Sequence, residues 1–335
     1  MTNATNSSPL KTDWQRLHGG AFAGARVLVT GGAGFIGSHI CEALSILGAD
    51  VVVIDDLSGG SDPSNVGFPR VQFVKGSILD RELLAKLTAG CRYVFHQAAL
   101  GSVPASVERP RDYHEANTTG TLNVLDAARK AGVARVMFAA SSSAYGENPV
   151  PWTETMPVLP ISPYAATKVA GEALLRAYSG SYGMDTASLR YFNIFGPRQN
   201  ANSAYAAVIA AFAKALLANK HPVIYGDGEQ SRDFTFVHNA VHANLLAARS
   251  TRKLAGEVIN VGCGQSVTVN HLAQEMAAAL GRPELTAQHH PERAGDLKHS
   301  YADLARATAL LDYKPVVDFE PGLATTIAWY KSVLA

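Results

Sequence analysis

A tyrosine and a lysine stand four residues apart in the stretch SPYAATK, at Tyr164 and Lys168. If this stretch is helical, the two side chains lie on one face of the helix, one turn apart. An isolated phenol has a pKa near ~10, and a neighbouring cation lowers that pKa because it favours the phenolate. The pair is therefore a candidate acid/base. A lone pair of this kind is equally compatible with a surface tyrosine over a solvated lysine, so the surrounding chain must decide.

A glycine turn in the stretch VLVTGGAGFIGSHI supplies the first supporting signal. Gly31, Gly34 and Gly37 recur every three residues, after a predicted buried strand and before an amphipathic helix. Glycines allow a tight turn and a close approach of the backbone to a pyrophosphate, and a helix N-terminus offers unpaired N–H groups. This context favours a dinucleotide site over a purely structural turn.

Asp55 ends the next predicted strand, DVVVID. An acid at this place can accept hydrogen bonds from an adenosine ribose, and its charge repels a 2′-phosphate. Asp55 therefore predicts NAD rather than NADP. The adjacent Asp56 can share the role, and a solvated loop acid is the alternative interpretation.

Three serines, Ser141 to Ser143, follow another predicted buried strand. Sheets of parallel strands bind their ligands at the carboxyl ends of the strands. A hydroxyl here can hydrogen-bond a substrate oxygen beside the tyrosine and relay its proton. A polar loop without a catalytic role is the alternative, and the tyrosine, the lysine and the glycine turn together disfavour it.

Strands and helices alternate along most of the chain, which predicts an α/β fold with a Rossmann-type doubly wound parallel sheet. After about Asn193, prolines and glycines punctuate a mixed region that suggests a smaller C-terminal substrate-binding lobe. We expect an N-terminal extension over 1–24, with one short helix at 12–17. We expect an NAD-binding domain over 25–192 to which the chain returns near 234–262, and mainly a substrate-binding lobe over 193–335. The predicted strands are 26–30, 50–55, 71–76, 93–99, 135–141, 187–193 and 257–262, and the predicted helices are 117–131, 164–182 and one that ends near residue 47.

The composition excludes several other classes of protein. The 335 residues are 47% hydrophobic and 17% charged, as in ordinary globular proteins, and the net charge of +1 gives no attraction to nucleic acid or anionic membrane. No apolar run approaches the ~20 residues of a membrane span, and the polar N-terminus lacks a signal-peptide core. Cys41, Cys91 and Cys263 are too scattered for a disulfide framework or a zinc site, and the histidines show no paired metal spacing. We expect a cytoplasmic protein without a metal.

Several stretches together resemble the extended short-chain dehydrogenase/reductases, over almost the whole chain after residue 24. They are the glycine turn, HQAA (96–99), SSSAYG (141–146), the Tyr164–Lys168 pair and LRYFNIFGPRQ (189–199). Within that group the chain looks like the bacterial UDP-N-acetylglucosamine 4-epimerases, in QAALGSVPASVE (97–108), NSAYAAVI (202–209), GDGEQSRDF (226–234) and AGDLKHSYAD (294–303). The resemblance implies bound NAD and the interconversion of UDP-N-acetylglucosamine and UDP-N-acetylgalactosamine through a 4-keto sugar.

The resemblance also assigns roles to individual residues. It implies that Tyr164 is the catalytic acid/base, that Lys168 lowers its pKa and binds the nicotinamide ribose, and that Ser141, with Ser142 close behind, relays the proton. The cofactor-binding residues that it implies are Gly31, Gly34, Phe35, Ile36, Gly37, Asp55, Ser77, Ile78, Gln97, Thr118, Tyr164 and Lys168. Relatives often carry an aspartate where this chain has Ser77, so a charge-assisted contact to adenine is lost and we expect weaker affinity for the same cofactor.

On the substrate side, the resemblance implies that Arg232 and Arg293 hold the diphosphate, which suits their planar guanidinium groups. It implies that Asn193 contacts the diphosphate-sugar. Tyr225 either stacks on uracil or packs in the core. Ser102 either faces the sugar or caps a helix.

Ser300 carries the inference about substrate preference. Epimerases restricted to UDP-glucose and UDP-galactose have a tyrosine at what looks like the matching position, and a small residue there leaves room for a 2-acetamido group. Tyr301 is the next residue, so a shift of one position in the match would reverse the inference. The closest rivals are the same reaction on UDP-glucose and UDP-galactose, or on a UDP-N-acetylhexosaminuronic acid.

More distant rivals are a sugar-nucleotide dehydratase or reductase and a nucleotide-binding module without activity. Dehydratases usually carry Thr-Asp-Glu in the strand-end loop, where this chain has no carboxylate among residues 141–144. A binding module has no need of the serine, the tyrosine and the lysine together. Relatives pair through two helices per subunit into a four-helix bundle, which predicts a homodimer through 117–131 and 164–182, with Ala170 and Gly171 allowing close approach.

Overall fold

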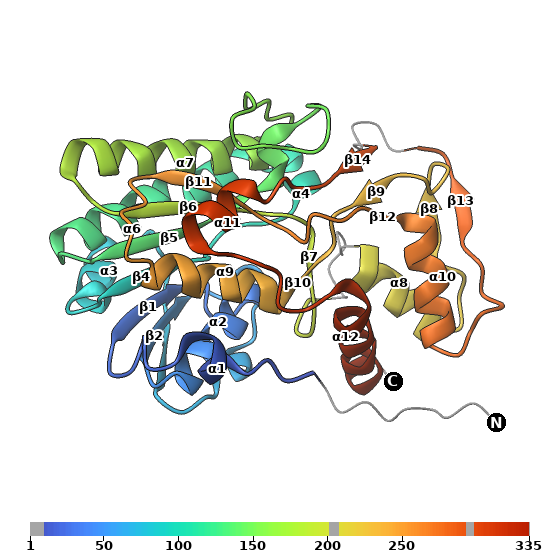
Figure 1. Ribbon diagram of the computed structural model, residues 1–335, viewed down its shortest axis with the longest axis horizontal. Helices are drawn as coiled ribbons and strands as arrows, with labels where there is room; N and C mark the ends of the chain where they lie inside the picture. Colours follow the sequence, from blue (N-terminus) through green and yellow to red (C-terminus); the bar gives the residue numbers. More distant parts are fainter. Residues whose placement is uncertain (1–9, 201–207, 293–297, 335) are drawn as a thin grey trace.

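The centre of the structure is a parallel sheet with helices packed on both of its faces (Figure 1). The computed structural model describes residues 10–200, 208–292 and 298–334. In these ranges the sheet has the strand order β11-β6-β5-β4-β1-β2-β3, and each neighbouring pair is parallel. The predicted doubly wound fold is therefore confirmed. The order reverses between β1 and β4, which is where sheets of this kind open a crevice for a ligand. The strands are β1 (Arg26–Thr30), β2 (Asp50–Asp55), β3 (Val71–Lys75), β4 (Tyr93–His96), β5 (Arg135–Ser141), β6 (Thr186–Tyr191) and β11 (Glu257–Val261).

The inner strands are buried on both sides, which is why they read as continuous apolar runs rather than as alternating ones. After its first residue, every residue of β2 is buried. Four strands end earlier than predicted: β4 at His96 and β6 at Tyr191, and β3 and β11 by one residue each. The residues that follow them leave the sheet at its carboxyl edge and become loops.

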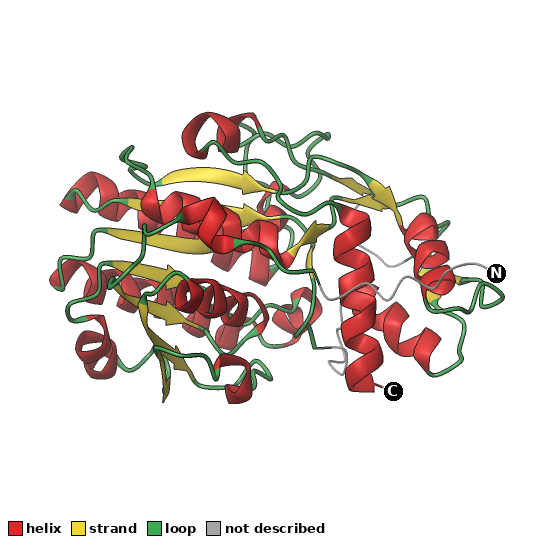
Figure 2. Cartoon of the chain, turned by 60° about the horizontal axis from the view of Figure 1, so that its bottom comes forward, coloured by secondary structure: helices red, strands yellow, loops and turns green. Residues whose placement is uncertain are grey.

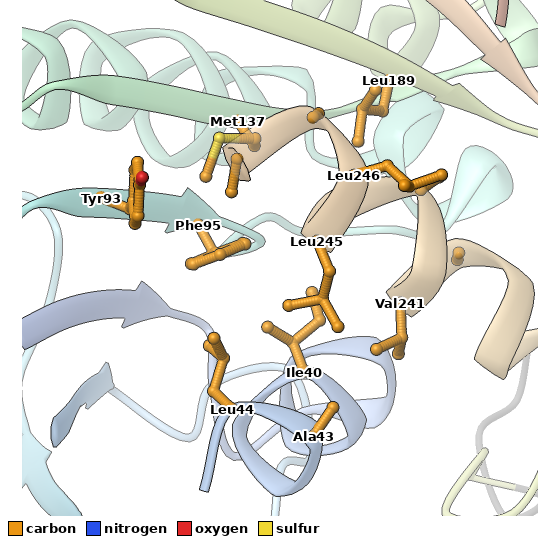
Figure 3. Packing of buried hydrophobic residues seen from close by; sticks show 14 of the residues in the cluster. Ile40, Ala43, Leu44, Tyr93, Phe95, Met137, Leu189, Val241, Leu245 and Leu246 are labelled. Carbon is orange, nitrogen blue, oxygen red and sulfur yellow. The ribbon is translucent and has the colours of Figure 1, made fainter. Parts of the chain in front are cut away.

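One face of the sheet is covered mainly by α2 and α9. Figure 3 shows Ile40 and Leu44 of α2 meeting Val241 and Leu245 of α9, with Phe95 of β4 beneath them. The other face is covered by α3, α6 and α7. The helices of the two faces are α1 (Trp14–His18), α2 (Phe35–Ile46), α9 (Val237–Arg249) and α11 (Ala305–Leu311), then α3 (Arg81–Thr88), α6 (Gly120–Lys130) and α7 (Pro163–Tyr182).

The second half of the predicted N-terminal extension is part of the core. Trp14 in α1 is 4% exposed and Phe22 is fully buried, and both belong to the cluster that α2 and α9 form with the sheet. Residues 1–13 are polar, so the sequence pattern did not indicate that Trp14 and Phe22, which follow them, are buried. The short helix predicted at 12–17 lies at Trp14–His18.

Helix α7 begins and ends as its sequence dictates. Ser162 is its N-cap and accepts a hydrogen bond from the Ala165 N–H at 3.1 Å, with proline in the first turn. Gly183 ends it in the left-handed conformation at φ 69°. Gly171 is buried, and a Cβ there would lie 2.4 Å from Cζ of Phe138. The expectation that Gly171 serves a helix pairing between subunits is therefore wrong, because this glycine lets α7 approach its own sheet.

The other predicted helix, 117–131, is divided in the structure. A π-helical stretch, His114–Thr119, precedes α6. Before it lie the short helices α4 (Val103–Glu108) and α5 (Pro110–Tyr113). Single 3₁₀ turns lie at Pro63–Val66 and Ser142–Tyr145.

A second hydrophobic core lies beyond the carboxyl edge of the sheet, around α8, α10 and α12 (Figures 1 and 2). Between residues 193 and 256 the chain builds part of this region and then crosses back to the sheet, where β11 pairs with β6. The elements of this region are α8 (Val208–Leu217), α10 (Val269–Ala279), α12 (Phe319–Leu334), β7 (Ile194–Phe195), β8 (Val223–Tyr225), β9 (Ser231–Arg232), β10 (Thr235–Phe236), β12 (Val267–Thr268), β13 (Gln288–His290) and β14 (His299–Ser300).

Replacing Gly171 with alanine should destabilise the fold by about 1–3 kcal/mol, because the added methyl group overpacks the contact with Phe138. Gly180 lies on the same helix, and a Cβ added there would meet nothing within 4 Å, so Gly180→Ala is the matched control. The control should be stabilised by up to ~1 kcal/mol through helix propensity. Urea unfolding followed by circular dichroism measures both changes. Equal effects of the two substitutions would contradict the close contact.

Candidate active site

A cleft of about 620 Å³ runs along the carboxyl edge of the sheet. The predicted cofactor-binding residues that line it are Gly31, Gly34, Phe35, Ile36, Gly37, Asp55, Ser77, Ile78, Gln97, Tyr164 and Lys168. Thr118 does not line the cleft. On the same π-helical stretch, Asn117 points inward instead, and its amide exchanges hydrogen bonds with the backbone of Leu100.

The glycine turn between β1 and α2 has the shape that a pyrophosphate requires. Gly31 adopts φ 67°, and a Cβ there would lie 2.6 Å from the backbone nitrogen of Ala98. A Cβ on Gly37 would lie 2.2 Å from the carbonyl oxygen of Gly31, so only glycine lets α2 start so close to the turn. Gly34 caps α2 without a side chain, which leaves the N–H groups of the first helical turn available to an anion.

Asp55 stands at the end of β2, beside this turn. Its carboxylate accepts hydrogen bonds from the Ala33 N–H at 3.1 Å and from the Leu57 N–H at 2.9 Å. Burial raises the pKa of Asp55, and these two hydrogen bonds oppose the rise. Asp56 also lines the cleft but is exposed, and its carboxylate accepts from the Ser58 N–H at 2.9 Å. The glycine cradle, the open helix end and this acid fit an NAD molecule lying along the cleft.

Helix α7 brings Tyr164 and Lys168 to the cleft, one turn apart on the same face. The Lys168 ammonium donates to the carbonyl oxygen of Ala139 at 2.8 Å. It lies 5.8 Å from the centroid of the Tyr164 ring and 5.0 Å from that of Phe138. The lysine is therefore held between the sheet and the tyrosine by one backbone acceptor and two aromatic faces.

The pKa of Tyr164 shifts in the opposite direction to the expected one. Burial raises it, and the neighbouring Tyr113 adds to the rise, while a hydrogen bond with Ser141 opposes it. Burial also lowers the pKa of Lys168 to about 7, against the carboxylate of Glu172, which raises it. Burial is the largest cause of both shifts, and it disfavours the charged form of each group.

The structure separates the two candidate serines. Ser141 is the last residue of β5, and its hydroxyl is the one that hydrogen-bonds Tyr164. Ser143 supports it, since its N–H and its hydroxyl both donate to Ser141 Oγ, at 3.2 Å and 2.9 Å. Ser142 begins the next turn. Ser141 is therefore the serine that the fold brings to the tyrosine.

A second cavity, of about 290 Å³, lies beside the cleft within the C-terminal region. Asn193, Tyr225 and Arg232, three of the predicted substrate-binding residues, line it. Gln199 lines both the cavity and the cleft, so the two spaces share a wall. Arg293, the other predicted diphosphate ligand, lies outside the described residues.

Ser300 is 5% exposed and lies in β14, paired with Arg232 of β9. Its hydroxyl lies 3.3 Å from the Asn193 amide nitrogen, which donates to it. Ser300 therefore contacts a residue that lines the second cavity, while Tyr301 is partly exposed.

Ser102 caps a helix, which is one of its two alternatives, while its contact with the sugar stays a prediction. Its hydroxyl accepts from the Ala105 N–H at 3.2 Å as the N-cap of α4, and the residue also lines the cleft.

Two tyrosines that line the cleft were missed in the sequence. The Tyr191 hydroxyl donates to Gln97 at 3.1 Å and accepts from the Asn244 amide at 2.7 Å. The Tyr113 hydroxyl accepts from the Ser102 N–H at 3.1 Å. Tyr191 stands near a predicted strand end in the LRYFN stretch, and this position could have indicated that it lines the cleft. Nothing in the sequence distinguishes Tyr113.

Within the described ranges, no group of three or more His, Cys, Asp and Glu side chains is arranged to hold a metal ion. In the same ranges, no helix has the length and apolarity needed to cross a membrane.

Comparison with known families matches residues 27–262 to the NAD dependent epimerase/dehydratase family. A UDP-glucose 4-epimerase of Mycolicibacterium smegmatis is 39% identical over 313 residues, which span 92% of this chain and 99% of that one.

Two solved structures resemble the whole fold. One is a UDP-N-acetylglucosamine 4-epimerase from Methanobrevibacter ruminantium in complex with UDP-N-acetylmuramic acid. It is 42% identical with a TM-score of 0.89, and the match covers 93% of this chain and 100% of that one. The other is a UDP-glucose 4-epimerase from Thermotoga maritima with UDP-glucose. It is 36% identical with a TM-score of 0.87, over 92% and 100% of the two chains.

Replacing Asp55 with asparagine should lower the preference for NAD over NADP by about tenfold, or about 1.4 kcal/mol, because it removes a like-charge contact with the 2′-phosphate. Asp56→Asn is the matched control, since this neighbouring acid is turned toward Ser58. Calorimetric titration of cofactor-stripped protein with each nucleotide measures the preference. A larger loss of preference in the control would move the role to Asp56.

Proposed function

The chain belongs to the NAD dependent epimerase/dehydratase family, and we propose that it interconverts UDP-N-acetylglucosamine and UDP-N-acetylgalactosamine. It is an enzyme, a UDP-sugar 4-epimerase, and its cofactor is NAD. The observation that carries the proposal is that Tyr164 and Lys168 line a cofactor cleft that adjoins a second cavity, with Ser141 hydrogen-bonded to Tyr164.

The geometry gives each side chain a task in inverting C4. Bound NAD supplies a reversible hydride acceptor for the sugar. Tyr164 removes the proton of the sugar O4 as C4 is oxidised, and Ser141 hydrogen-bonds the same oxygen and relays the proton. Lys168 binds the nicotinamide ribose and favours the phenolate of Tyr164. The 4-keto sugar turns in the pocket, and Tyr164 then returns the proton on reduction from the opposite face.

The cavity next to the cleft suits the nucleotide part of the substrate. We propose that Arg232 and Arg293 hold the diphosphate, that Asn193 contacts it, and that Tyr225 stacks on uracil. Arg232, Tyr225 and Asn193 line one cavity with apolar side chains around them, which favours a flat base with a charged group attached. Ser102 lines the cleft and is proposed to face the sugar.

Ser300 supports the acetylated sugar as the preferred substrate. It is a small buried residue beside Asn193, and a tyrosine in its place would add a ring next to the cavity. The second candidate is the same reaction on UDP-glucose and UDP-galactose. Relatives named for UDP-glucose, at 36–39% identity, favour this alternative.

We also propose that the enzyme works as a cytoplasmic homodimer. The helices expected to pair are α6 and α7. Leu122 of α6 is 40% exposed, and alanines 166, 173 and 177 of α7 are exposed. Small residues on an outer helix face allow a second pair of helices to approach closely into a bundle.

Replacing Tyr164 with phenylalanine should reduce kcat by about 10²-fold or more, because the acid/base is removed while the ring remains. The measurement is proton NMR of purified protein with UDP-N-acetylglucosamine and no added cofactor, following the appearance of the galacto epimer. Bound NAD and the thermal midpoint of unfolding should stay near those of the unmodified protein. Near-normal turnover in this variant would refute the proposed mechanism.

Replacing Ser300 with tyrosine should suppress turnover of UDP-N-acetylglucosamine and spare UDP-glucose, because the ring takes the space of the 2-acetamido group. The same NMR assay run on both sugars measures the ratio of kcat/KM values. Ser300→Thr, which keeps the hydroxyl, is the control and should retain both activities. An equal loss on both sugars would show that Ser300 does not set the preference.

A further inference from the structure

A buried ion pair lies behind the Tyr164–Lys168 pair. Glu172, one turn after Lys168 on α7, accepts two hydrogen bonds from Arg190 of β6, at 2.8 Å from Nε and 2.7 Å from Nη2. Both side chains are almost fully buried. The guanidinium of Arg190 also lies 4.5 Å from the centroid of the Tyr145 ring. Two parallel hydrogen bonds of this kind fix both the position and the charge state of the carboxylate.

The groups that face Lys168 come from every element around it. On its own helix they are Tyr164 and Glu172, and on β5 they are the Ala139 carbonyl and the Phe138 ring. On β4 the facing group is His96. From the α5 side, Tyr113 stacks edge-on against Tyr164 at 6.5 Å.

His96 does not contribute a charge near neutral pH. It is buried between the hydroxyls of Thr30 and Thr121, at 2.7 Å and 2.9 Å, and burial lowers its pKa to about 3. The two tyrosines are neutral phenols. The Glu172 carboxylate is therefore the anion that acts on Lys168 in the described part of the chain.

We propose that Glu172 is a positioning residue of the active site, which keeps Lys168 protonated at neutral pH, with Arg190 as the counter-charge that limits this effect. The inference rests on the proposed function, in which the ammonium of Lys168 supports Tyr164. It gives the ion pair a task beyond holding α7 against β6.

The balance of charges explains why this task is needed. Burial lowers the pKa of Lys168 to about 7 although the carboxylate of Glu172 raises it, so the lysine is close to losing its proton at neutral pH. Without the carboxylate, the ammonium form is less favoured and Lys168 loses its proton at lower pH. Without Arg190, the carboxylate is no longer neutralised, the ammonium is more favoured, and Lys168 keeps its proton to higher pH.

Two single variants therefore make opposite predictions although both break the same ion pair. In Glu172→Gln, the alkaline limb of the pH profile of kcat should move to lower pH by about one unit. In Arg190→Gln, the same limb should move to higher pH. A purely structural role of the pair predicts shifts in one direction or none, because each variant loses the same hydrogen-bonded contact.

Shifts in opposite directions support the proposal, and shifts in the same direction, or no shift in either variant, overturn it.

A second readout does not depend on turnover. Holoenzyme carrying ¹³Cε-labelled lysine is titrated by NMR, with the Lys168 signal assigned by its absence in Lys168→Met. The double variant Glu172→Gln/Arg190→Gln has no charge in this pair, so its Lys168 should titrate between that of Glu172→Gln, which leaves the Arg190 cation unpaired, and that of Arg190→Gln. If the unmodified enzyme turns over no UDP-sugar, the proposed function fails, while the NMR titration still decides this inference.

Discussion

The close packing of α7 on β5 is the constraint on which the active site depends. One helix carries Tyr164 and Lys168, and one strand ends in Ser141, so the distance between helix and strand sets the distance between the acid/base and its hydrogen-bonding partner. Gly171 and Phe138 make that distance short, because there is no side chain between the helix backbone and the aromatic ring. A contact that looks like ordinary core packing thus sets the geometry of the reacting groups.

The C-terminal region holds a buried charge of its own, which backbone N–H groups stabilise. Asp233 is fully buried next to Arg232, and it accepts hydrogen bonds from the backbone N–H groups of Cys263, Gly264 and Ala302. Burial raises its pKa to about 6. These contacts join β9, the turn after β11 and the segment that follows Ser300. A buried carboxylate satisfied by backbone donors is costly to disturb, so it ties the walls of the substrate cavity to the sheet.

Structural features that depend only on neighbouring residues could be predicted from the sequence. The glycine turn, the buried strands and the bounds of α7 follow from a few neighbouring residues, and their positions were predicted to within a few residues. Contacts between residues that lie far apart in the sequence could not be predicted from it. Gly171 was assigned to an outer surface because a sequence does not show which face of a helix meets the sheet. Trp14 was assigned to an extension because its partners lie far along the chain. The preference for Ser141 over Ser142 came from the family pattern, and the strand predicted over 135–141 has the bounds of β5.

The late return of β11 to the sheet has a consequence for how the protein is made. A ribosome delivers β6 well before β11, since the whole segment between residues 192 and 256 must be synthesised first. During that interval β6 is an edge strand, and its unpaired N–H and C=O groups can pair with a strand of another molecule. When β11 arrives and docks in parallel register against β6, that edge is closed. The order of synthesis therefore places the greatest risk of aggregation in the period when the cofactor half is nearly complete and the rest of the chain is still on the ribosome.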